Sequence, residues 1–162
     1  AEVGQLLFAA QGITNAAQGF RTAPSAGALY PLEVYIVAGK VEGLAAGIYK
    51  YVPTRHELMS IVTGDKRQEL AGAALGQQCV TDGAITVVLS AVYRRTMGKY
   101  KERGIRYVHI EAGHAGQNVC LQATALGLGI VPVGAFDDGR VKQLLKMPDE
   151  EDPLYLLPVG KK

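Results

Sequence analysis

Apolar residues in the second half of the chain follow the helical period over an unusual length. From Arg106 to Leu126 they step by three and four residues, which predicts an amphipathic helix with one apolar stripe. The stripe consists of Val108, Ala112, Ala115, Val119, Ala123 and Leu126. At about 1.5 Å per residue such a helix would span about 30 Å, the width of a small domain. We therefore expect it to be the central helix, ended by Gly127.

Other segments have the pattern of strands. Ala84–Val92 is a nearly uninterrupted apolar run, which predicts a central strand buried on both faces. Further strands are predicted at Leu32–Ala38, Gly47–Val52, Glu57–Val62, Ile130–Phe136 and Leu154–Val159, the first three as a small antiparallel meander.

Shorter helices and loops complete the expected fold. We predict helices over 2–11, from the Asp65 cap to about Leu75, and from 137 to about Lys146, with a loop over 12–31. The cationic stretch 94–106 is expected to be either a solvated loop and helix start or a patch for an anionic cofactor or substrate. Strands separated by helices predict an α+β fold, an α/β sandwich with a mixed, mostly antiparallel sheet and a long central helix.

The composition is that of an ordinary globular protein. Of 162 residues, 48% are hydrophobic and 20% charged, and the formal charge of +2 is too small to suggest a nucleic-acid partner. No apolar run approaches the ~20 residues of a membrane span, and no signal peptide opens the chain. Cys79 and Cys120 have no metal or redox spacing, so reduced thiols are expected. We expect one soluble, cytoplasmic domain over residues 1–162.

The segment Arg21–Pro31 has the most informative chemistry. Pro24 and Pro31 bracket small residues, so the backbone is held in a fixed loop that little side-chain bulk covers. Such a loop leaves N–H groups and the Ser25 hydroxyl free for a flat polar ligand. Taken alone, it is also compatible with a tight connection into the first long strand.

Five segments together resemble the nitroreductase family of flavin mononucleotide (FMN) enzymes, in its branch of SagB-type dehydrogenases. They are Arg21–Pro31, Lys99–Tyr107, Glu111–Asn118, Gly127–Phe136 and Pro153–Gly160. They occur in the family's order and cover most of residues 5–160. The resemblance implies a nitroreductase-like fold, FMN as the cofactor, and a homodimer with the flavin at its interface.

The resemblance also implies which residues contact the flavin. They are Arg21, Pro24, Ser25, Ala26, Gly27, Pro132, Val133, Gly134 and Ala135, with the loop 24–27 and the segment 132–135 coming from different subunits. Gly134 is the candidate backbone donor to flavin N5, with Ala135 second. Arg21 is the candidate cation near N1 and O2, where it would stabilise the reduced ring.

The phosphate contacts are incomplete by the same comparison. The family supplies an Arg-Arg-Ser-type motif before its first helix, whereas this sequence begins inside that helix. We therefore expect the N-terminal phosphate-binding segment to be missing, so that either the sequence is a trimmed piece or other cations serve. Lys161 and Lys162 match the region where the family adds C-terminal basic residues. A solvated terminus is the alternative for both.

Lys99 and Tyr100 are the candidate catalytic residues. They match the Lys-Tyr pair of those SagB-type members that oxidise azoline rings to azoles in ribosomal peptides, where the pair is implicated in catalysis. A lysine or a tyrosine can serve as a base when its surroundings lower its pKa.

Two other kinds of site are not favoured. Gly127–Gly134 runs from helix into strand, opposite to the dinucleotide-binding fingerprint, so NAD(P)H would bind only transiently as a substrate. Glu111, His114 and Asn118 share a helix face, but a second Glu-x-x-His motif on another helix is lacking, so hydrogen bonding across an interface is preferred to a metal site.

These expectations combine into a homodimeric FMN-dependent oxidoreductase that passes hydride or electrons through flavin N5. NAD(P)H would be the donor and a small planar molecule, a nitroaromatic or quinone, the acceptor. Two alternatives stay open: a SagB-type dehydrogenase that oxidises azoline rings in a peptide, and a non-catalytic flavin-binding subunit.

Overall fold

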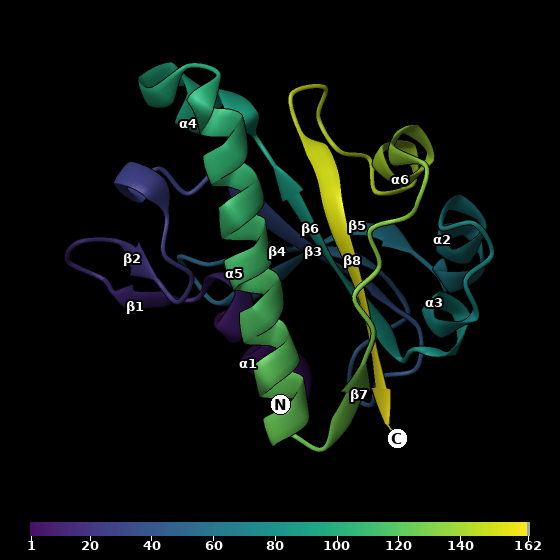
Figure 1. Cartoon of the computed structure of the whole chain (residues 1–162). Coiled ribbons are helices and arrows are strands. Elements are labelled where there is room, and N and C mark those ends of the chain that lie inside the picture. The colour runs from purple at the N-terminus through teal and green to yellow at the C-terminus, as the bar shows by residue number, and fades with distance from the viewer. Residues whose placement is uncertain (162) are drawn as a thin grey trace.

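Strand β6 (Ile85–Ala91) lies in the middle of a six-stranded sheet, and every one of its residues is buried. The computed structural model describes residues 1–161, and Figure 1 shows the sheet running through it. The strand order is β5-β4-β3-β6-β8-β7, with all pairings antiparallel. The other strands are β3 (Leu32–Ala38), β4 (Gly47–Val52), β5 (Glu57–Thr63), β7 (Leu128–Ile130) and β8 (Asp152–Lys161).

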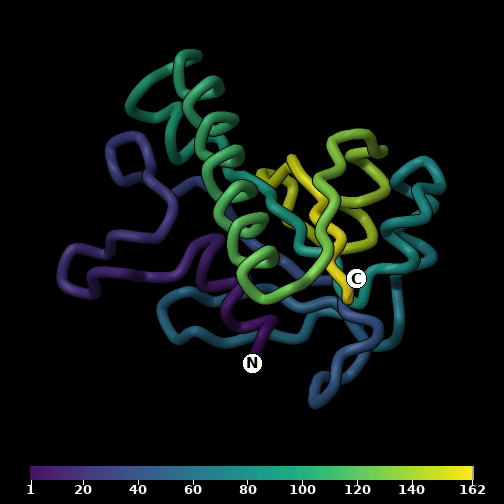
Figure 2. The backbone as a smooth tube through the Cα atoms, turned by 60° about the horizontal axis from the view of Figure 1, so that its bottom comes forward, coloured from purple at the N-terminus to yellow at the C-terminus, as the bar shows by residue number. Residues whose placement is uncertain are grey.

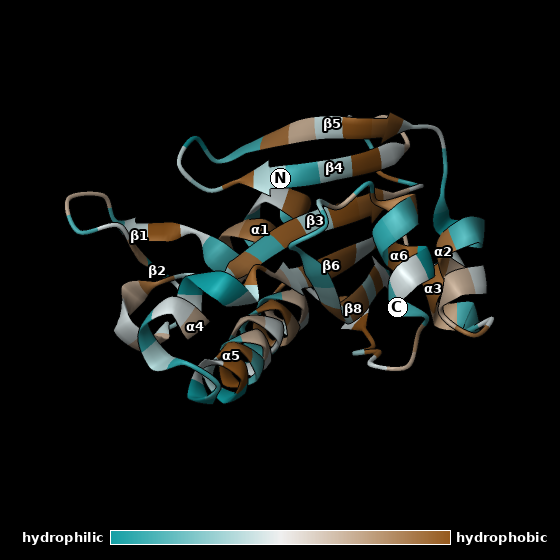
Figure 3. Cartoon of the chain, turned by 90° about the horizontal axis from the view of Figure 1, so that it is seen from above, coloured by the Kyte–Doolittle hydropathy of each residue, from teal (hydrophilic) through white to brown (hydrophobic). Residues whose placement is uncertain are grey.

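The two faces of the sheet cover two separate hydrophobic cores. Val87 and Leu89 of β6 pack under α1 (Glu2–Gln11) and α5 (Arg103–Ala125), whereas Val88 faces the opposite core. The helices of that second core are α2 (Arg67–Ala73), α3 (Gln78–Asp82) and α6 (Asp138–Leu144). Figure 3 shows the two groups of helices on opposite sides of the sheet. The predicted fold class is therefore confirmed, as is a central strand buried on both faces.

Helix α5 is the predicted central helix. It has 23 residues and crosses one face of the sheet (Figure 1), which corresponds to a length of about 35 Å. Its stripe is buried from Val108 to Ala123, as predicted. Gly116 lies against the Tyr155 ring of β8, where an added methyl group would be 3.2 Å from two ring carbons. Close packing on the sheet therefore accounts for this glycine.

The predicted loop over residues 12–31 was wrong in part. Residues Ile13–Asn15 (β1) and Phe20–Arg21 (β2) form a short hairpin that stands away from the body of the molecule (Figure 2). Asn15 Oδ1 accepts the Gln18 N–H across the turn, and Gly19 adopts a φ of 68°. Strands of three and two residues are too short to produce an alternating pattern, so the sequence did not reveal them.

The cationic stretch after β6 is a helix rather than a loop. Helix α4 (Tyr93–Tyr100) buries only Thr96, so it lacks the apolar periodicity on which helix prediction depends. The small helix α3 was missed as well. Helix α2 ends before the predicted Leu75, because Leu75 and Gly76 turn the chain with φ of 57° and 74°.

The strand predicted at Ile130–Phe136 is displaced toward the N-terminus. Regular pairing stops after Ile130: the Val131 N–H still donates to the Pro158 carbonyl at 3.1 Å, but Pro158 has no N–H to donate in return. Only an isolated bridge follows, in which Val133 and Leu156 exchange hydrogen bonds of 2.8 and 3.0 Å. Helix α6 then begins where expected, with the Asp137 side chain accepting the Arg140 N–H. No helix of the described chain combines the length and apolar character required to cross a membrane.

Gly104 brings α4 and α5 together, which makes their contact sensitive to one methyl group. A methyl group at Gly104 would lie 2.9 Å from the Met97 backbone nitrogen, too close without a shift of either helix. We expect Gly104→Ala to lower the free energy of unfolding by about 1–3 kcal/mol. Gly98→Ala on α4 has open space around it and should raise that free energy by up to about 1 kcal/mol. Urea denaturation measures both changes. Equal free energies of unfolding for Gly104→Ala and Gly98→Ala would contradict the close contact between α4 and α5.

Candidate functional site

The loop between β2 and β3 is held in an unusual backbone conformation. Its 3-10 turn η1 (Ala26–Ala28) contains Gly27 at φ 65° and Ala28 at φ 54°, and Tyr30 follows at φ 45°. Left-handed backbone at a residue other than glycine costs of the order of 1 kcal/mol or more. The loop therefore needs contacts that compensate for this strain.

Ser25 provides one such contact. Its Oγ accepts the Tyr30 N–H at 2.9 Å, and its backbone oxygen accepts the Ala28 N–H at 3.0 Å. The Ser25 hydroxyl oxygen therefore already accepts one hydrogen bond from within the loop, while its proton remains available to an acceptor. The N–H groups of Ser25, Ala26 and Gly27 have no acceptor within residues 1–161 and remain available.

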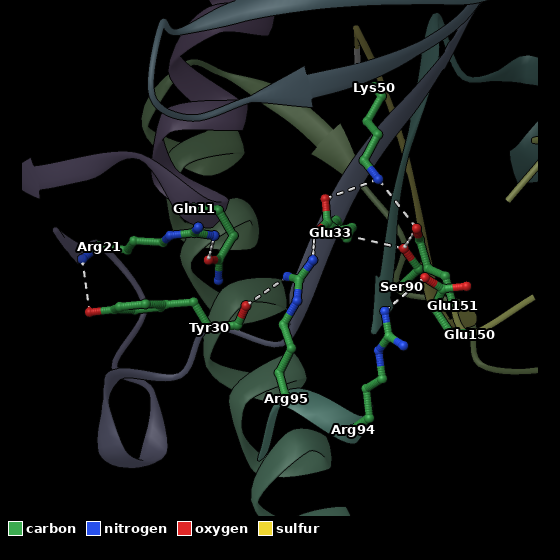
Figure 4. Close-up of polar contacts among 10 residues, drawn as sticks. All are labelled: Gln11, Arg21, Tyr30, Glu33, Lys50, Ser90, Arg94, Arg95, Glu150 and Glu151. Carbon is green, nitrogen blue, oxygen red and sulfur yellow. Dashed lines mark hydrogen bonds and ion pairs between the residues drawn. The ribbon is translucent and has the colours of Figure 1, made fainter. Parts of the chain in front are cut away.

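Arg21 lies half-buried behind the loop (Figure 4). Its Nη1 donates to Gln11 Oε1 at 2.9 Å, and its guanidinium stands 4.8 Å from the centre of the Tyr30 ring. Burial lowers the pKa of Arg21, while the nearby Glu33 carboxylate raises it. The residue is thus a charged group with little water around it, fixed by a glutamine and an aromatic ring.

The structure brings Lys99 and Tyr100 onto the same loop. A methyl group at Gly27 would lie 2.8 Å from Tyr100 Oη and 3.1 Å from Lys99 Nζ, so both side chains end at this glycine. The Tyr100 ring packs edge-to-face on Tyr107 of α5, with ring centres 5.1 Å apart. Candidate catalytic and candidate flavin-binding residues therefore share one surface.

Arg95 connects helix α4 to the end of the loop. Its Nη1 donates to the Tyr30 carbonyl at 3.1 Å, and its Nη2 pairs with Glu33 Oε1 at 2.6 Å (Figure 4). Glu33 also pairs with Lys50, at 3.0 Å. Burial would raise the pKa of Glu33, but Lys50 and Arg95 together lower it below its ordinary value. Glu33 is therefore a charged anchor for the helix that carries Lys99 and Tyr100.

The same network continues into the sheet. Lys50 reaches the buried Glu151 at 3.2 Å, and Ser90 Oγ of β6 donates to the other carboxylate oxygen at 2.6 Å. Figure 4 shows these groups converging from three strands and the segment before β8. A buried charge is stable only when it is paired in this way.

The segment 132–135 lies elsewhere. It runs on the opposite side of α5 from the loop 24–27 in both views (Figures 1 and 2). Pro132, Gly134 and Ala135 are exposed, whereas Val133 is buried beside β8. The N–H groups of Gly134 and Ala135 find no acceptor among the described residues, and nothing lies within 4 Å of a methyl group added at Gly134. One chain therefore offers two open backbone segments but does not bring them together.

Lys161 lies at a separate place. It lines a hollow of about 890 Å³ together with Lys40 and three acidic residues, Glu2, Glu42 and Asp82. The opposing charges nearly balance, so the hollow by itself is not a strongly cationic phosphate site. Lys162, the other residue predicted to bind phosphate, lies outside the described residues.

The sequence model of the Nitroreductase family matches residues 1–161. The chain belongs to the nitroreductase family. A protein of Methanocaldococcus jannaschii that is provisionally named a nitroreductase is 48% identical over 161 residues, which cover 99% of this chain and 80% of that protein.

Two further relatives are longer than this nitroreductase-family chain. The Microcin B17-processing protein McbC of Escherichia coli is 32% identical over 133 residues, 78% of this chain but 48% of that protein. A crystal structure of a provisionally named nitroreductase from Anabaena variabilis superposes with a TM-score of 0.90 at 30% identity. The match covers 98% of this chain and 34% of the Anabaena chain, so this chain spans about a third of its length.

Some residues of this candidate site were not found from the sequence. Glu33 was missed, although an acidic residue within the apolar run of β3 was a usable signal. Arg95 was predicted only as part of the cationic stretch 94–106, and Glu111 only as part of a helix face with His114 and Asn118. Glu111 is in fact 2% exposed, next to the buried Ala112 of α5. The other members of that face point elsewhere: His114 is exposed, and Asn118 Nδ2 donates to the Thr22 carbonyl at 3.3 Å.

The adjacent arginines of α4 provide a matched test of the anchor at Glu33. We expect Arg95→Met to lower the free energy of unfolding by about 1–3 kcal/mol, because a half-buried carboxylate and the Tyr30 carbonyl each lose a donor. Arg94→Met breaks only the exposed pair with Glu150 and should cost at most about 1 kcal/mol. Urea denaturation of both variants measures these changes. A smaller loss of unfolding free energy for Arg95→Met than for Arg94→Met would contradict the anchoring role of Glu33.

Proposed function

We propose that the protein is a homodimeric, FMN-dependent oxidoreductase that passes hydride or electrons from NAD(P)H to a small planar acceptor such as a nitroaromatic or quinone. The observation that carries the proposal is the pair of open backbone segments, 24–27 and 132–135, in a chain of the nitroreductase family. Each presents unpaired N–H donors beside small residues, which suits the polar edges of a flat ring.

FMN fits these segments by its shape and its acceptors. When bound, FMN supplies the ring that accepts and releases hydride. Gly134 would donate its N–H to the N5 edge, with Ala135 as the second candidate, and the loop 24–27 would donate to the ring's oxygen acceptors. Arg21 would supply positive potential behind that loop, where negative charge develops on reduction.

A second copy of the chain would complete the site. Because the two segments lie on opposite sides of α5, one ring cannot meet both within one chain (Figures 1 and 2). The outer side of α5 suits such a partner, since Ile110 and Leu121 are 49% and 60% exposed and Gly113 has nothing within 4 Å. Exposed apolar side chains at helical spacing are typical of an association surface.

The remaining details of the proposal follow from the family. One FMN-binding domain would cover residues 1–162, and Lys161 would be a phosphate contact that needs help from further cations. NAD(P)H would be a transient substrate. The protein would be located in the cytoplasm, where NAD(P)H is abundant.

A second candidate is dehydrogenation of an azoline ring carried by a peptide. The observation that favours it is the position of Lys99 Nζ and Tyr100 Oη at Gly27, together with the similarity to the Microcin B17-processing protein. A base at that position could take the proton that leaves carbon as hydride passes to the flavin. A non-catalytic flavin-binding subunit is the third candidate.

A visible absorption spectrum tests the proposal first. After FMN is added and unbound flavin removed, we expect flavin bands at about one flavin per chain, which NADH or NADPH should bleach under anaerobic conditions. A protein that stays colourless would overturn the proposal. Retained flavin that neither nucleotide reduces would indicate the non-catalytic subunit.

Replacing the two side chains at Gly27 separates the enzymatic candidates. Lys99→Met and Tyr100→Phe should lower oxidation of a thiazoline-containing peptide by about 100-fold or more, the usual contribution of a general base. Both should leave quinone reduction by NAD(P)H nearly unchanged, because hydride transfer to a quinone needs no such base. Lys101→Met, with its side chain exposed nearby, is the matched control. Steady-state rates on both substrates, with flavin content measured, give the answer; undetectable peptide oxidation by the unaltered protein would exclude the second candidate.

A further inference from the structure

Glu111 is an acidic residue in a place that the fold otherwise fills with apolar side chains. It lies on the buried side of α5 beside Ala112 and is 2% exposed. Its Oε1 is buried and has no hydrogen-bond partner within residues 1–161. Ionising a buried carboxyl group that has one oxygen without a partner is costly, so the protonated form is favoured at this position.

The surroundings of Glu111 belong to the loop 24–30. Burial raises the pKa of Glu111 to about 7, although hydrogen bonding from Ser25 and the positive charge of Arg21 act to lower it. Arg21 in turn is influenced by Glu33 of β3, Arg95 of α4 and Tyr30. Gln11 of α1, which takes the Arg21 hydrogen bond, does not titrate. Arg21 is therefore the cation that acts on the pKa of Glu111.

Arg21 is nevertheless committed to other partners. Its guanidinium binds Gln11 and covers the Tyr30 ring, and it forms no ion pair with Glu111 in the described chain. This is the arrangement expected when Glu111 is neutral. An ionised Glu111 would attract Arg21 and so compete with Gln11 and Tyr30 for it.

The hydrogen bonds of Ser25 link the carboxyl group to the loop. Because Ser25 Oγ accepts the Tyr30 N–H, its own proton is free to point to another acceptor, and Glu111 is on that side. Tyr30 has a left-handed backbone and is held there by this bond and by Arg95. A change of charge at Glu111 therefore acts on the loop through both Ser25 and Arg21.

We propose that Glu111 is a positioning residue whose protonated carboxyl group keeps the loop 24–30 in the conformation that binds flavin. This inference rests on the proposed function, since it takes the loop to be part of the flavin site. The phosphate of FMN and the negative charge gained on reduction both favour the protonated carboxyl group. Flavin binding is thus accompanied by proton uptake at Glu111, and is tighter below neutral pH than above it.

The first measurement needs no flavin. In the apo protein, the carboxyl carbon of Glu111 and the amide of Tyr30 should titrate by NMR with one shared midpoint near pH 7. In Glu111→Gln the titration of the Tyr30 amide should disappear. Glu150→Gln is the control, because Glu150 is a carboxylate outside this network that pairs with Arg94 at 3.1 Å. It should leave the Tyr30 titration unchanged.

The pH dependence of the free energy of unfolding gives an independent measurement of the proton on Glu111. The folded pKa of Glu111 is raised above its unfolded value, about 4.3, so the native state binds more protons between that value and pH 7. The free energy of unfolding should therefore fall as pH rises through this window, by an amount that Glu111→Gln lacks. The wild-type NMR titration still decides the question if Glu111→Gln folds poorly, and Ser25→Ala, which cuts the link to Tyr30, is the second variant.

The second measurement is FMN affinity from quenching of flavin fluorescence at pH 6 and pH 8. The ratio of wild-type to Glu111→Gln dissociation constants should rise about tenfold between these values, as expected for a group with a pKa near 7. The FMN phosphate also titrates in this range, but it changes the dissociation constants of both proteins by the same factor, so its effect cancels in the ratio. A ratio that stays constant would overturn the proposal.

The two measurements separate the possible failures. Absence of FMN binding by every variant at both pH values would overturn the proposed function, while the Tyr30 titration would still report whether Glu111 controls the loop. A Tyr30 amide that titrates identically in Glu111→Gln would overturn the role of Glu111 whether or not FMN binds.

Discussion

The antiparallel register between β3 and β6 determines where the chemistry of this chain is assembled. Leu32 pairs with Ala91, so the residue before β3 and the residue after β6 lie side by side, and Val92 N donates to the Pro31 carbonyl at 2.9 Å. The loop that precedes β3 and the helix that follows β6 must therefore start from the same corner of the sheet. Lys99 and Tyr100 reach Gly27 for this reason, although more than seventy residues separate them in sequence. A register shift of one residue would reverse every side chain of a strand that is buried on both faces, so the corner is firmly defined.

Ion pairs and hydrogen bonds then stabilise the loop at this corner of the sheet and offset its backbone strain. Two residues other than glycine have left-handed backbone in the loop, and each costs free energy that local contacts must offset. Arg95 supplies a charge-assisted bond to Tyr30 and a pair to Glu33, which Lys50 neutralises from the neighbouring strand. The strain and the buried charges occur together because the same few contacts satisfy both. Regions of this kind are more common at functional sites than in structural cores.

The sequence revealed those parts of the molecule whose signal is local. The stripe of α5 and the apolar run of β6 are single-segment patterns, and both were predicted correctly because burial of a long regular face leaves a clear period. Helix α4 and the β1–β2 hairpin carry no such period, since almost nothing on them is buried. The loop residues were found through motifs. The roles of Glu33, Arg95 and Glu111 depend on contacts between distant elements, and residue type alone does not show which charge meets which.

Two glycines in the middle of α5, Gly113 and Gly116, differ in whether contacts within the chain explain them. Each should cost about 1 kcal/mol of helix propensity relative to alanine. Gly116 is explained within the chain, because the Tyr155 ring occupies the space that a methyl group would need. Gly113 has open space around it on the outer side of the helix, between the exposed Ile110 and Leu121. Its cost is not offset by any contact in residues 1–161, and the proposed second copy of the chain would supply such a contact on that side. Helix α5 also lies between the two open backbone segments, 24–27 and 132–135. A second copy of the chain packed on the outer side of α5 would contact Gly113 and would bring segment 24–27 of one chain close to segment 132–135 of the other.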